Sequence, residues 1–369
     1  MRSIPLRRWT LGLIAVPIAL TAALLRAPSA AVAPPAPLHN AIAAAPTSSA
    51  TPPPTATAQP TPPPSATPAP TSTPTTRPDS TPTPRPADTP PHVGIQVGHW
   101  RSSELPDELK RLRSSTGAFA GGYKEADVNL NVATRVVELL KSRGIAVDLL
   151  PATIPPAYDA DAIVAIHADG STSAGSRGFK LATPWRTSRA SQQLLDTLTA
   201  EYATATGLPQ DDAITFNMKG YYAFNYRRHT HAIARTTPAV IIEMGFLTNA
   251  ADRAVMIGRA DDTAIGIANG IIRYLNERDR SDGDALLPPE FKTQRPLAAE
   301  GVDVHSAPSD KARVVAHVQP DGRLFVFLER DGWYQVFVRG AARVTGWVRK
   351  DQVVDTDDPP PTPPPATDS

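Results

Sequence analysis

The stretch DAIVAIHADG, residues 161–170, decides how the chain is expected to fold. Residues 162–166 form an unbroken apolar run that ends at His167. A short apolar run between polar residues is typical of a strand buried on both faces, as in a parallel sheet. In open α/β sheets, the functional groups lie just beyond the carboxyl ends of such strands. We therefore expect His167 to lie at the functional edge of a parallel sheet.

Two further apolar stretches also end in a residue that can do chemistry. Residues 93–99, VGIQVGH, run up to His99, and residues 239–243, AVIIE, run up to Glu243. A single histidine after a strand is more often a structural residue than a metal ligand. Three such endings, with His167 as the third, favour one site where the strand ends meet.

The composition limits the kind of site that can be built. The 369 residues are enough for one medium-sized and one small domain, and a net charge of +1 does not indicate a nucleic-acid partner. The chain has no cysteine, so it has neither disulfides nor thiolate metal ligands. A metal must be bound by histidine, aspartate and glutamate, which favours zinc or another divalent ion in an open site.

Residues 1–33 are predicted to be a signal peptide. Arginines lie at the start, residues 9–25 are almost wholly apolar, and the small residues Ala-Val-Ala follow at 31–33. The apolar run is interrupted by Pro17 and is shorter than the ~20 residues of a membrane span. We expect cleavage rather than a retained anchor. The protein should then be secreted or held in the cell envelope, outside the cytoplasmic membrane.

Residues 34–90 are predicted to be a disordered linker, because proline, threonine, alanine and serine make up most of the stretch. Such a composition buries too little apolar surface to offset the entropy of ordering the chain. Polyproline II segments extend about 3.1 Å per residue, so we expect the linker to act as a long spacer. Residues 356–369, rich in proline and aspartate, are predicted to be a disordered tail.

Residues 91–279 are predicted to form one α/β domain. Apolar strands alternate with amphipathic helices, which is typical of a twisted, mostly parallel sheet flanked by helices. The clearest helix has an apolar residue at every fourth position from Val128, and Gly144 follows its end. The expected strands are 93–99, 145–150, 162–166, 177–183, 220–226 and 239–243, and the expected helices are 127–143, 189–206 and 261–277.

His99, Glu125 and His167 together supply two imidazoles and one carboxylate. This is the ligand set of open catalytic zinc sites, which leave one coordination position for water. Zinc lowers the pKa of such a water to about 7, giving hydroxide at neutral pH. The spacings of 26 and 42 residues match no short metal motif, and Glu125 taken alone is better interpreted as a solvated or helix-capping residue. The residue types, more than their spacing, therefore indicate zinc.

Four motifs follow one another in residues 92–279. They are Gly98-His99, Glu125 with Asn129, AIHAD at 165–169, and EMGFLTN at 243–249. In this order they resemble the zinc-dependent N-acetylmuramoyl-L-alanine amidases of the Amidase_3 type. The resemblance implies a mixed twisted sheet flanked by helices, with His99, Glu125 and His167 as ligands of Zn²⁺ and Glu243 as the catalytic glutamate.

The chain departs from that family's pattern at three places. The family usually has Asp-Pro-Gly-His-Gly-Gly at the first ligand, where residues 96–100 read Gln-Val-Gly-His-Trp. A polar insertion then delays Glu125, and Asp169 stands where Asn is expected. The metal-binding set survives all three changes, whereas groups that position the substrate are the ones at stake.

Residues 219–231 leave two interpretations open. They form either a wall of the substrate site or a polar loop with a few packed aromatic residues, and His229 or His231 is an alternative metal ligand. Glu243 has alternatives too, as a fourth ligand or as the partner of an arginine such as Arg227. A carboxylate in so apolar a strand needs a cation or hydrogen bonds to offset its burial.

Residues 288–355 have an all-β pattern. Asp331-Gly332 lies between two expected strands and is a strong hairpin signal. The motifs VHSAPS, DGWYQV and GWV resemble a bacterial SH3 domain, which implies a small barrel that binds cell-wall peptides or packs on the enzyme. Trp333, Tyr334 and Trp347 are candidates for a binding groove. The alternative is that Trp333 and Trp347 are core residues of the barrel, and we favour the core role for Trp347. The expected strands are 323–330, 333–339 and 343–349.

The sequence thus predicts an exported peptidoglycan hydrolase. It would cleave the amide bond between N-acetylmuramic acid and L-alanine with zinc-activated water and Glu243 as the base. The alternatives are a zinc peptidase acting on stem peptides and a non-catalytic protein that binds the cell wall. Peptidoglycan is the expected partner and nucleic acid is not. We expect a monomer that meets the membrane only if its N-terminal segment is retained.

Overall fold

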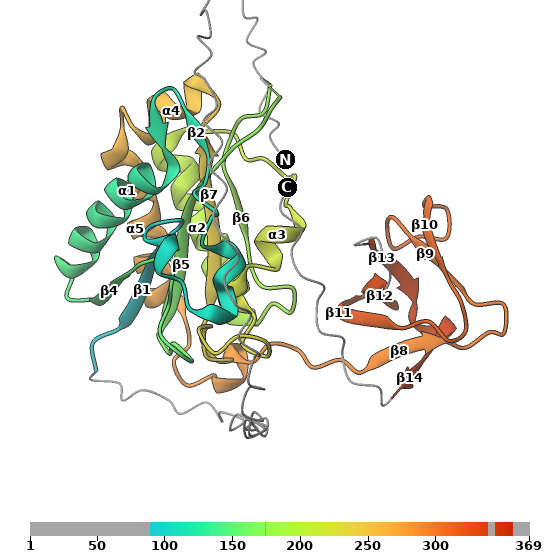
Figure 1. Cartoon of the computed structure of the whole chain (residues 1–369). Helices are drawn as coiled ribbons and strands as arrows, with labels where there is room; N and C mark the ends of the chain where they lie inside the picture. The colour runs from blue at the N-terminus through green and yellow to red at the C-terminus, as the bar shows by residue number, and fades with distance from the viewer. Residues whose placement is uncertain (1–88, 174, 339–343, 357–369) are drawn as a thin grey trace, which may run out of the picture. The chain divides into compact units, whose positions relative to one another are not determined.

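The computed structural model describes residues 89–173, 175–338 and 344–356 (Figure 1). The predicted signal peptide lies outside these ranges, as do all but the last two residues of the predicted linker and all but the first residue of the predicted tail. Among the described residues, no helix combines the length and the apolar character needed to cross a bilayer.

A five-stranded sheet forms the centre of the first domain, and β5 is its middle strand (Figure 1). Its order is β4 (Ala146–Leu150), β1 (His92–Val97), β5 (Ala162–Asp169), β7 (Ala239–Phe246) and β6 (Lys180–Ala182). The first four strands run parallel, and β6 pairs antiparallel with β7. The prediction of a mostly parallel sheet, built around the apolar run before His167, is confirmed.

One face of this sheet is covered by helices. They are α1 (Glu125–Lys141), α2 (Arg189–Thr206) and α5 (Ala260–Glu277), and their apolar residues share one core with those of β1, β5 and β7. In α1 the residues repeated at intervals of four are all buried, as predicted. These residues are Val128, Val132, Val136 and Leu140.

The other face of the sheet is covered by irregular segments. Side chains from residues 105–112, 152–160 and 214–233 pack there against Ile163 of β5. Successive residues of a strand point to opposite faces, so His167 shares this face with Ile163. The helix-covered and loop-covered faces therefore differ in kind, and the candidate ligand lies on the loop-covered one.

Four polar residues of the strands lie on the loop-covered face. The alternation along each strand places Gln96 of β1, His167 of β5, Glu243 of β7 and Lys180 of β6 there, because their neighbours belong to the core under the helices. Glu243 is the direct register partner of His167 on one side and of Lys180 on the other. A polar row thus crosses three strands of the sheet.

The ends of five predicted elements are wrong by two or three residues, among them β6, which begins at Lys180 and not at residue 177. β1 ends at Val97, so His99 lies in the following turn. β5 and β7 continue beyond His167 and Glu243 because the residues after them also remain buried and paired. α1 begins at Glu125 itself. The candidate residues therefore lie within elements or turns and not simply after strands.

The predicted strand at 220–226 is wrong. The region contains α3 (Phe216–Lys219) and the 3₁₀ helix η3 (Tyr222–Phe224). All three residues of η3 are buried in the core of the loop-covered face, whereas a strand would send alternate side chains to opposite sides. No sequence pattern predicted the short helix α4 (Ala250–Met256), in which the Asn249 side chain caps the first turn.

The second domain is a seven-stranded antiparallel sheet, which confirms the all-β prediction. Asp331 and Gly332 both have positive φ, 51° and 79°, in the tight turn between β11 and β12. Trp333 and Trp347 are only 8% and 7% exposed, but neither belongs to the apolar cluster around Val304, Leu324 and Val336. Residues 339–343 lie outside the described ranges, and they include the last residue of the strand predicted at 333–339 and the first of the strand predicted at 343–349. The strand order is β10 (Val314–Val318), β9 (Val302–His305), β13 (Val344–Arg349), β12 (Trp333–Val338), β11 (Leu324–Arg330), β8 (Thr293–Pro296) and β14 (Val353–Thr356).

The substitution Gly270→Ala tests the close packing of α5 on α2. A Cβ at this position would lie 2.6 Å from the Leu198 Cα. Alanine is the better helix former by about 1 kcal/mol. We nevertheless expect Gly270→Ala to lower the free energy of unfolding, since overpacking costs about 1–3 kcal/mol. Asn269→Ala, at the exposed neighbouring position, should not lower it. Urea unfolding measures both, and a Gly270→Ala protein as stable as wild type would contradict the packing.

Candidate metal centre

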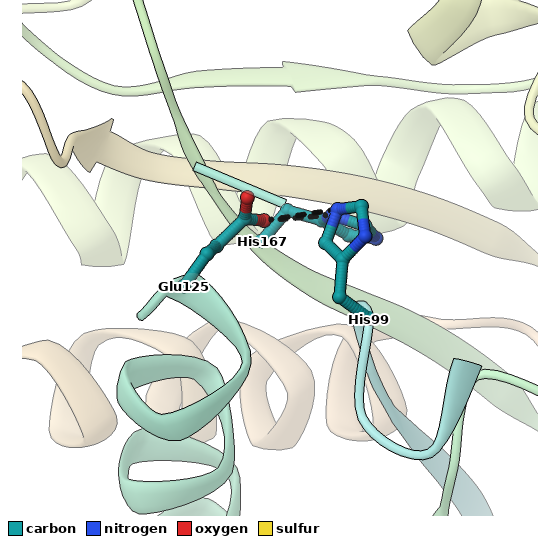
Figure 2. Close-up of side chains that lie close together, drawn as sticks. All are labelled: His99, Glu125 and His167. Atoms are coloured by element: carbon teal, nitrogen blue, oxygen red, sulfur yellow. Dashed lines mark hydrogen bonds and ion pairs between the residues drawn. The ribbon is translucent and has the colours of Figure 1, made fainter. Parts of the chain in front are cut away.

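His99, Glu125 and His167 point toward one another at the carboxyl end of the sheet (Figure 2). One ligand atom from each lies within 4.8 Å of the others. Oε1 of Glu125 is 3.1 Å from Nδ1 of His167 and 3.4 Å from Nε2 of His99. In the part of the chain that the structure describes, no other group of three His, Cys, Asp or Glu residues is so arranged.

His99 is presented by the turn that follows β1. Its backbone has φ 61°, in the left-handed region that residues other than glycine seldom adopt. Its Nδ1 donates a hydrogen bond to the Ser115 carbonyl oxygen at 2.9 Å, which leaves Nε2 toward Glu125. Gly117 makes room for this arrangement, since a Cβ there would lie 2.8 Å from the His99 ring.

Glu125, the first residue of α1, is a buried carboxylate with hydrogen bonds on both oxygens. Oε2 accepts from the Ala118 N–H at 2.8 Å, and Oε1 accepts from the Ala168 N–H and the Asn129 amide at 3.2 Å each. Burial by itself raises the pKa of Glu125, but the adjacent imidazoles and the Ala118 N–H outweigh burial and lower the pKa. The group is therefore ionised at neutral pH, as a metal ligand must be.

The His167 ring is held between two neighbours on the loop-covered face. A Cβ on Gly98 would lie 2.4 Å from the ring, so only glycine allows the turn after β1 to approach it this closely. On the other side the Tyr221 hydroxyl lies 3.3 Å from Nε2, and the two rings meet edge to face with centroids 5.4 Å apart. Tyr221, expected in a substrate wall or a polar loop, is therefore part of the histidine's immediate surroundings.

The donor chemistry of the three side chains fits a divalent metal ion. Two imidazole nitrogens and one carboxylate oxygen are the donors that zinc accepts in open sites. Burial, and then the proximity of His167, lower the pKa of His99, which keeps its imidazole in the neutral form that binds metals. The negative charge of Glu125 thus faces two imidazoles in a buried place, and a bound cation would balance it.

Glu243 lies beside this group on β7. Its Oε2 is buried and accepts no hydrogen bond. Burial, followed by repulsion from nearby carboxylates, raises the pKa of Glu243 well above its usual value. Among the described residues, Glu243 forms no ion pair with Arg227, so the salt-bridge interpretation has no support in the structure. Glu243 is therefore a buried carboxyl group beside the metal-binding residues, with one oxygen that has no hydrogen-bond partner.

Lys180 is a buried cation that no sequence argument singled out. Its Nζ lies 2.7 Å from Oδ2 of Asp169, 2.9 Å from Oδ2 of Asp211 and 4.6 Å from the centre of the Phe246 ring. Burial opposes its charge, but the hydrogen bonds to the two aspartates outweigh burial and raise the pKa of Lys180. The only sequence signal for a buried cation was the position of this lysine inside the strand predicted at 177–183.

His229 and His231 lie outside the metal-binding group and are held by Glu108 instead. Nδ1 of His231 is 2.7 Å from Oε1 of Glu108, and that oxygen also accepts the His231 N–H. The Thr230 N–H donates to Oε2, and Nδ1 of His229 is 3.9 Å from it. These contacts fasten residues 229–231 to η2 (Asp107–Leu112), which gives both histidines a structural role.

Comparison with known proteins places the first domain in a family context. The Amidase_3 family model, described as N-acetylmuramoyl-L-alanine amidase, matches residues 93–273, just under half of the chain. No curated protein matches.

Three solved structures are similar to about half of the chain. The catalytic domain of the amidase CwlV from Bacillus (Paenibacillus) polymyxa var. colistinus is 25% identical, with 51% of this chain and 99% of that chain covered and a TM-score of 0.35. An N-acetylmuramoyl-L-alanine amidase from Clostridium difficile 630 is 19% identical, with 52% and 99% covered and a TM-score of 0.37. The amidase Ami1 from Mycobacterium smegmatis is 18% identical, with 51% and 97% covered and a TM-score of 0.37.

Lys180→Met tests whether the buried cation stabilises the site. The change leaves Asp169 and Asp211 facing each other without a cation, and breaking a buried ion pair costs up to about 3–5 kcal/mol. We expect a clear fall in the urea midpoint of the first domain. Arg273→Met, which removes an exposed pair with Glu277, is the control and should change the midpoint little. Equal midpoints for the two variants would show that Lys180 is not needed for stability.

Proposed function

We propose, from the amidase family match of residues 93–273, that the first domain is a zinc-dependent N-acetylmuramoyl-L-alanine amidase. It hydrolyses the amide bond between the lactyl group of N-acetylmuramic acid and L-alanine in peptidoglycan. The observation that carries the proposal is the convergence of His99, Glu125 and His167 inside the matched segment. These three residues are the proposed metal ligands.

His99, Glu125 and His167 would hold a zinc ion, which would supply a Lewis acid able to polarise the amide carbonyl and acidify water. Glu243 is the proposed base, which takes a proton from the attacking water and delivers one to the departing nitrogen of L-alanine. The water oxygen joins the carbonyl carbon and the carbon–nitrogen bond breaks, leaving a lactyl carboxylate and a free amine. Its place on β7, as the direct register partner of His167, puts the carboxylate beside the metal-binding group, where both proton transfers would take place.

The released ends distinguish the amidase from the two alternatives. Purified cell wall is incubated with the full chain, and the soluble and insoluble products are analysed by mass spectrometry. Peptides that begin with a free L-alanine amine, together with glycan strands stripped of peptide, support the amidase. Cuts inside the stem peptide support a zinc peptidase, and binding without any release supports a non-catalytic wall-binding protein.

Glu243→Gln separates a catalytic role from a ligand role. As the base, Glu243 is needed for turnover but not for metal binding, so the variant should keep its zinc and lose at least ~100-fold in rate. His167→Ala, in the same preparations, should lose zinc as well as activity. Glu138→Gln, on the exposed side of α1, is the matched control and should change neither. Loss of zinc from Glu243→Gln would make Glu243 a ligand, and near wild-type cleavage would remove it from the mechanism.

The second domain is proposed to be an SH3-like module that holds the enzyme on the cell wall. It has its own apolar core, formed around Val304, Leu324 and Val336. With residues 1–33 as a signal peptide and the proline-rich stretch as a spacer, the enzyme would act outside the cytoplasmic membrane as a monomer.

Deletion of residues 288–369 tests the wall-binding role. We expect the shortened protein to cleave soluble muropeptides but to sediment less with intact wall. Full-length His167→Ala controls for binding through the active site and should still sediment. Equal sedimentation of the full and shortened proteins would contradict the wall-binding role and leave the domain a packing role only.

A further inference from the structure

A buried chain of hydrogen bonds begins at His167 and runs into the core of the loop-covered face. The Tyr221 hydroxyl lies 3.3 Å from Nε2 of His167 and donates to Oε1 of Gln96 at 2.9 Å. The Gln96 amide nitrogen donates in turn to the Ala152 carbonyl at 3.2 Å and to the Tyr222 hydroxyl at 3.3 Å. The chain links β1, β5, η3 and the segment after β4.

The Ala152 carbonyl sets the direction of this chain. A backbone carbonyl has no hydrogen to give, so the Gln96 atom facing it must be the amide nitrogen. The amide oxygen then faces Tyr221, and since that oxygen can only accept, the single hydroxyl hydrogen of Tyr221 is used there. The Tyr221 hydroxyl oxygen therefore presents a lone pair, and not a hydrogen, to His167.

A lone pair at that place requires a hydrogen on Nε2 of His167. The other ring nitrogen, Nδ1, then faces Oε1 of Glu125 at 3.1 Å. His99 shows the same division, because its Nδ1 donates to Ser115 and its Nε2 faces the same Glu125 oxygen at 3.4 Å. Each imidazole thus has one nitrogen engaged by the protein and the other turned toward the metal-binding place.

We propose that Tyr221 and Gln96 are positioning residues that fix His167 with its hydrogen on Nε2 and so present Nδ1 to the metal ion. The proposal rests on the zinc centre proposed above. Hydrogen-bond partners of this kind hold the tautomer and the ring orientation of metal-binding histidines, and their loss typically lowers metal affinity about 10–100-fold.

Burial makes the chain effective. Gln96 is fully buried and Tyr222 is 9% exposed, so water cannot readily replace a missing partner. The ring of His167 cannot turn away, because it meets Tyr221 on one side and the backbone of Gly98 on the other.

Zinc affinity of full-length variants, measured by competition with a chromogenic chelator, tests the proposal. Tyr221→Phe removes only the hydroxyl and should weaken zinc binding about 10–100-fold. Tyr274→Phe removes a buried hydroxyl from α5, on the helix-covered face, and is the matched control that should bind zinc like wild type. Gln96→Leu keeps Tyr221 but frees its hydrogen to turn toward His167, which favours the wrong tautomer, so it too should weaken binding.

The tautomer itself can be read directly by nitrogen NMR of the zinc-loaded full chain labelled at its eight histidines. We expect a hydrogen on Nε2 of His167 that exchanges slowly with water in wild type and faster in Tyr221→Phe. This measurement decides the matter in wild type even if a variant fails to fold.

Three outcomes would overturn the proposal. A hydrogen on Nδ1 of His167 in the zinc-loaded protein contradicts the tautomer. Unchanged zinc affinity in folded Tyr221→Phe and Gln96→Leu removes the positioning role while leaving the zinc centre in place. A wild-type chain that binds no zinc defeats the metal centre and the positioning role together.

Discussion

A carboxylate buried between two imidazoles is the constraint on which the site depends. Glu125 is 4% exposed, and an ionised carboxylate is costly to bury unless hydrogen bonds and cations compensate. The compensation comes from separate parts of the chain, namely the Ala118 N–H before α1 and the Ala168 N–H of β5. Satisfying this one group therefore fixes the start of α1 against the end of β5, and that fixed placement is what brings His99 and His167 into range.

The two faces of the sheet differ in the residues that they carry. The helix-covered face is apolar and takes alternate residues of every long strand, while the polar residues Gln96, His167, Glu243 and Lys180 all lie on the loop-covered face. Irregular segments suit that role because they can offer hydroxyls and backbone groups at angles that a helix surface cannot. A shift of one residue in any strand would move its polar residue into the apolar core.

The group formed by His99, Glu125 and His167 was predicted from residue types and from the resemblance to a known family. Local patterns in the sequence were enough to predict the parallel sheet and the long helices. They succeeded because a strand buried on both faces leaves a long apolar run, and strand ends meet at one edge. They failed for Tyr221 and Lys180. Tyr221 reaches Gln96 across 125 residues from a segment without periodicity, and Lys180 is paired only by residues that the fold brings to it. Such contacts leave no trace in local spacing.

Two residues that depart from the amidase pattern, Gln96 and Asp169, have hydrogen-bond or ion-pair partners in the structure. Gln96, where the resembled family begins its motif with Asp, receives the Tyr221 hydroxyl and binds a backbone carbonyl. Asp169, where Asn is expected, adds a negative charge near Glu243, and Lys180 balances it at 2.7 Å. A buried amide or carboxylate without a partner would lower the stability of the fold, so such partners are expected at buried positions. Each change has a specific partner on the face that carries His167, so the fold accommodates both residues beside the candidate metal centre.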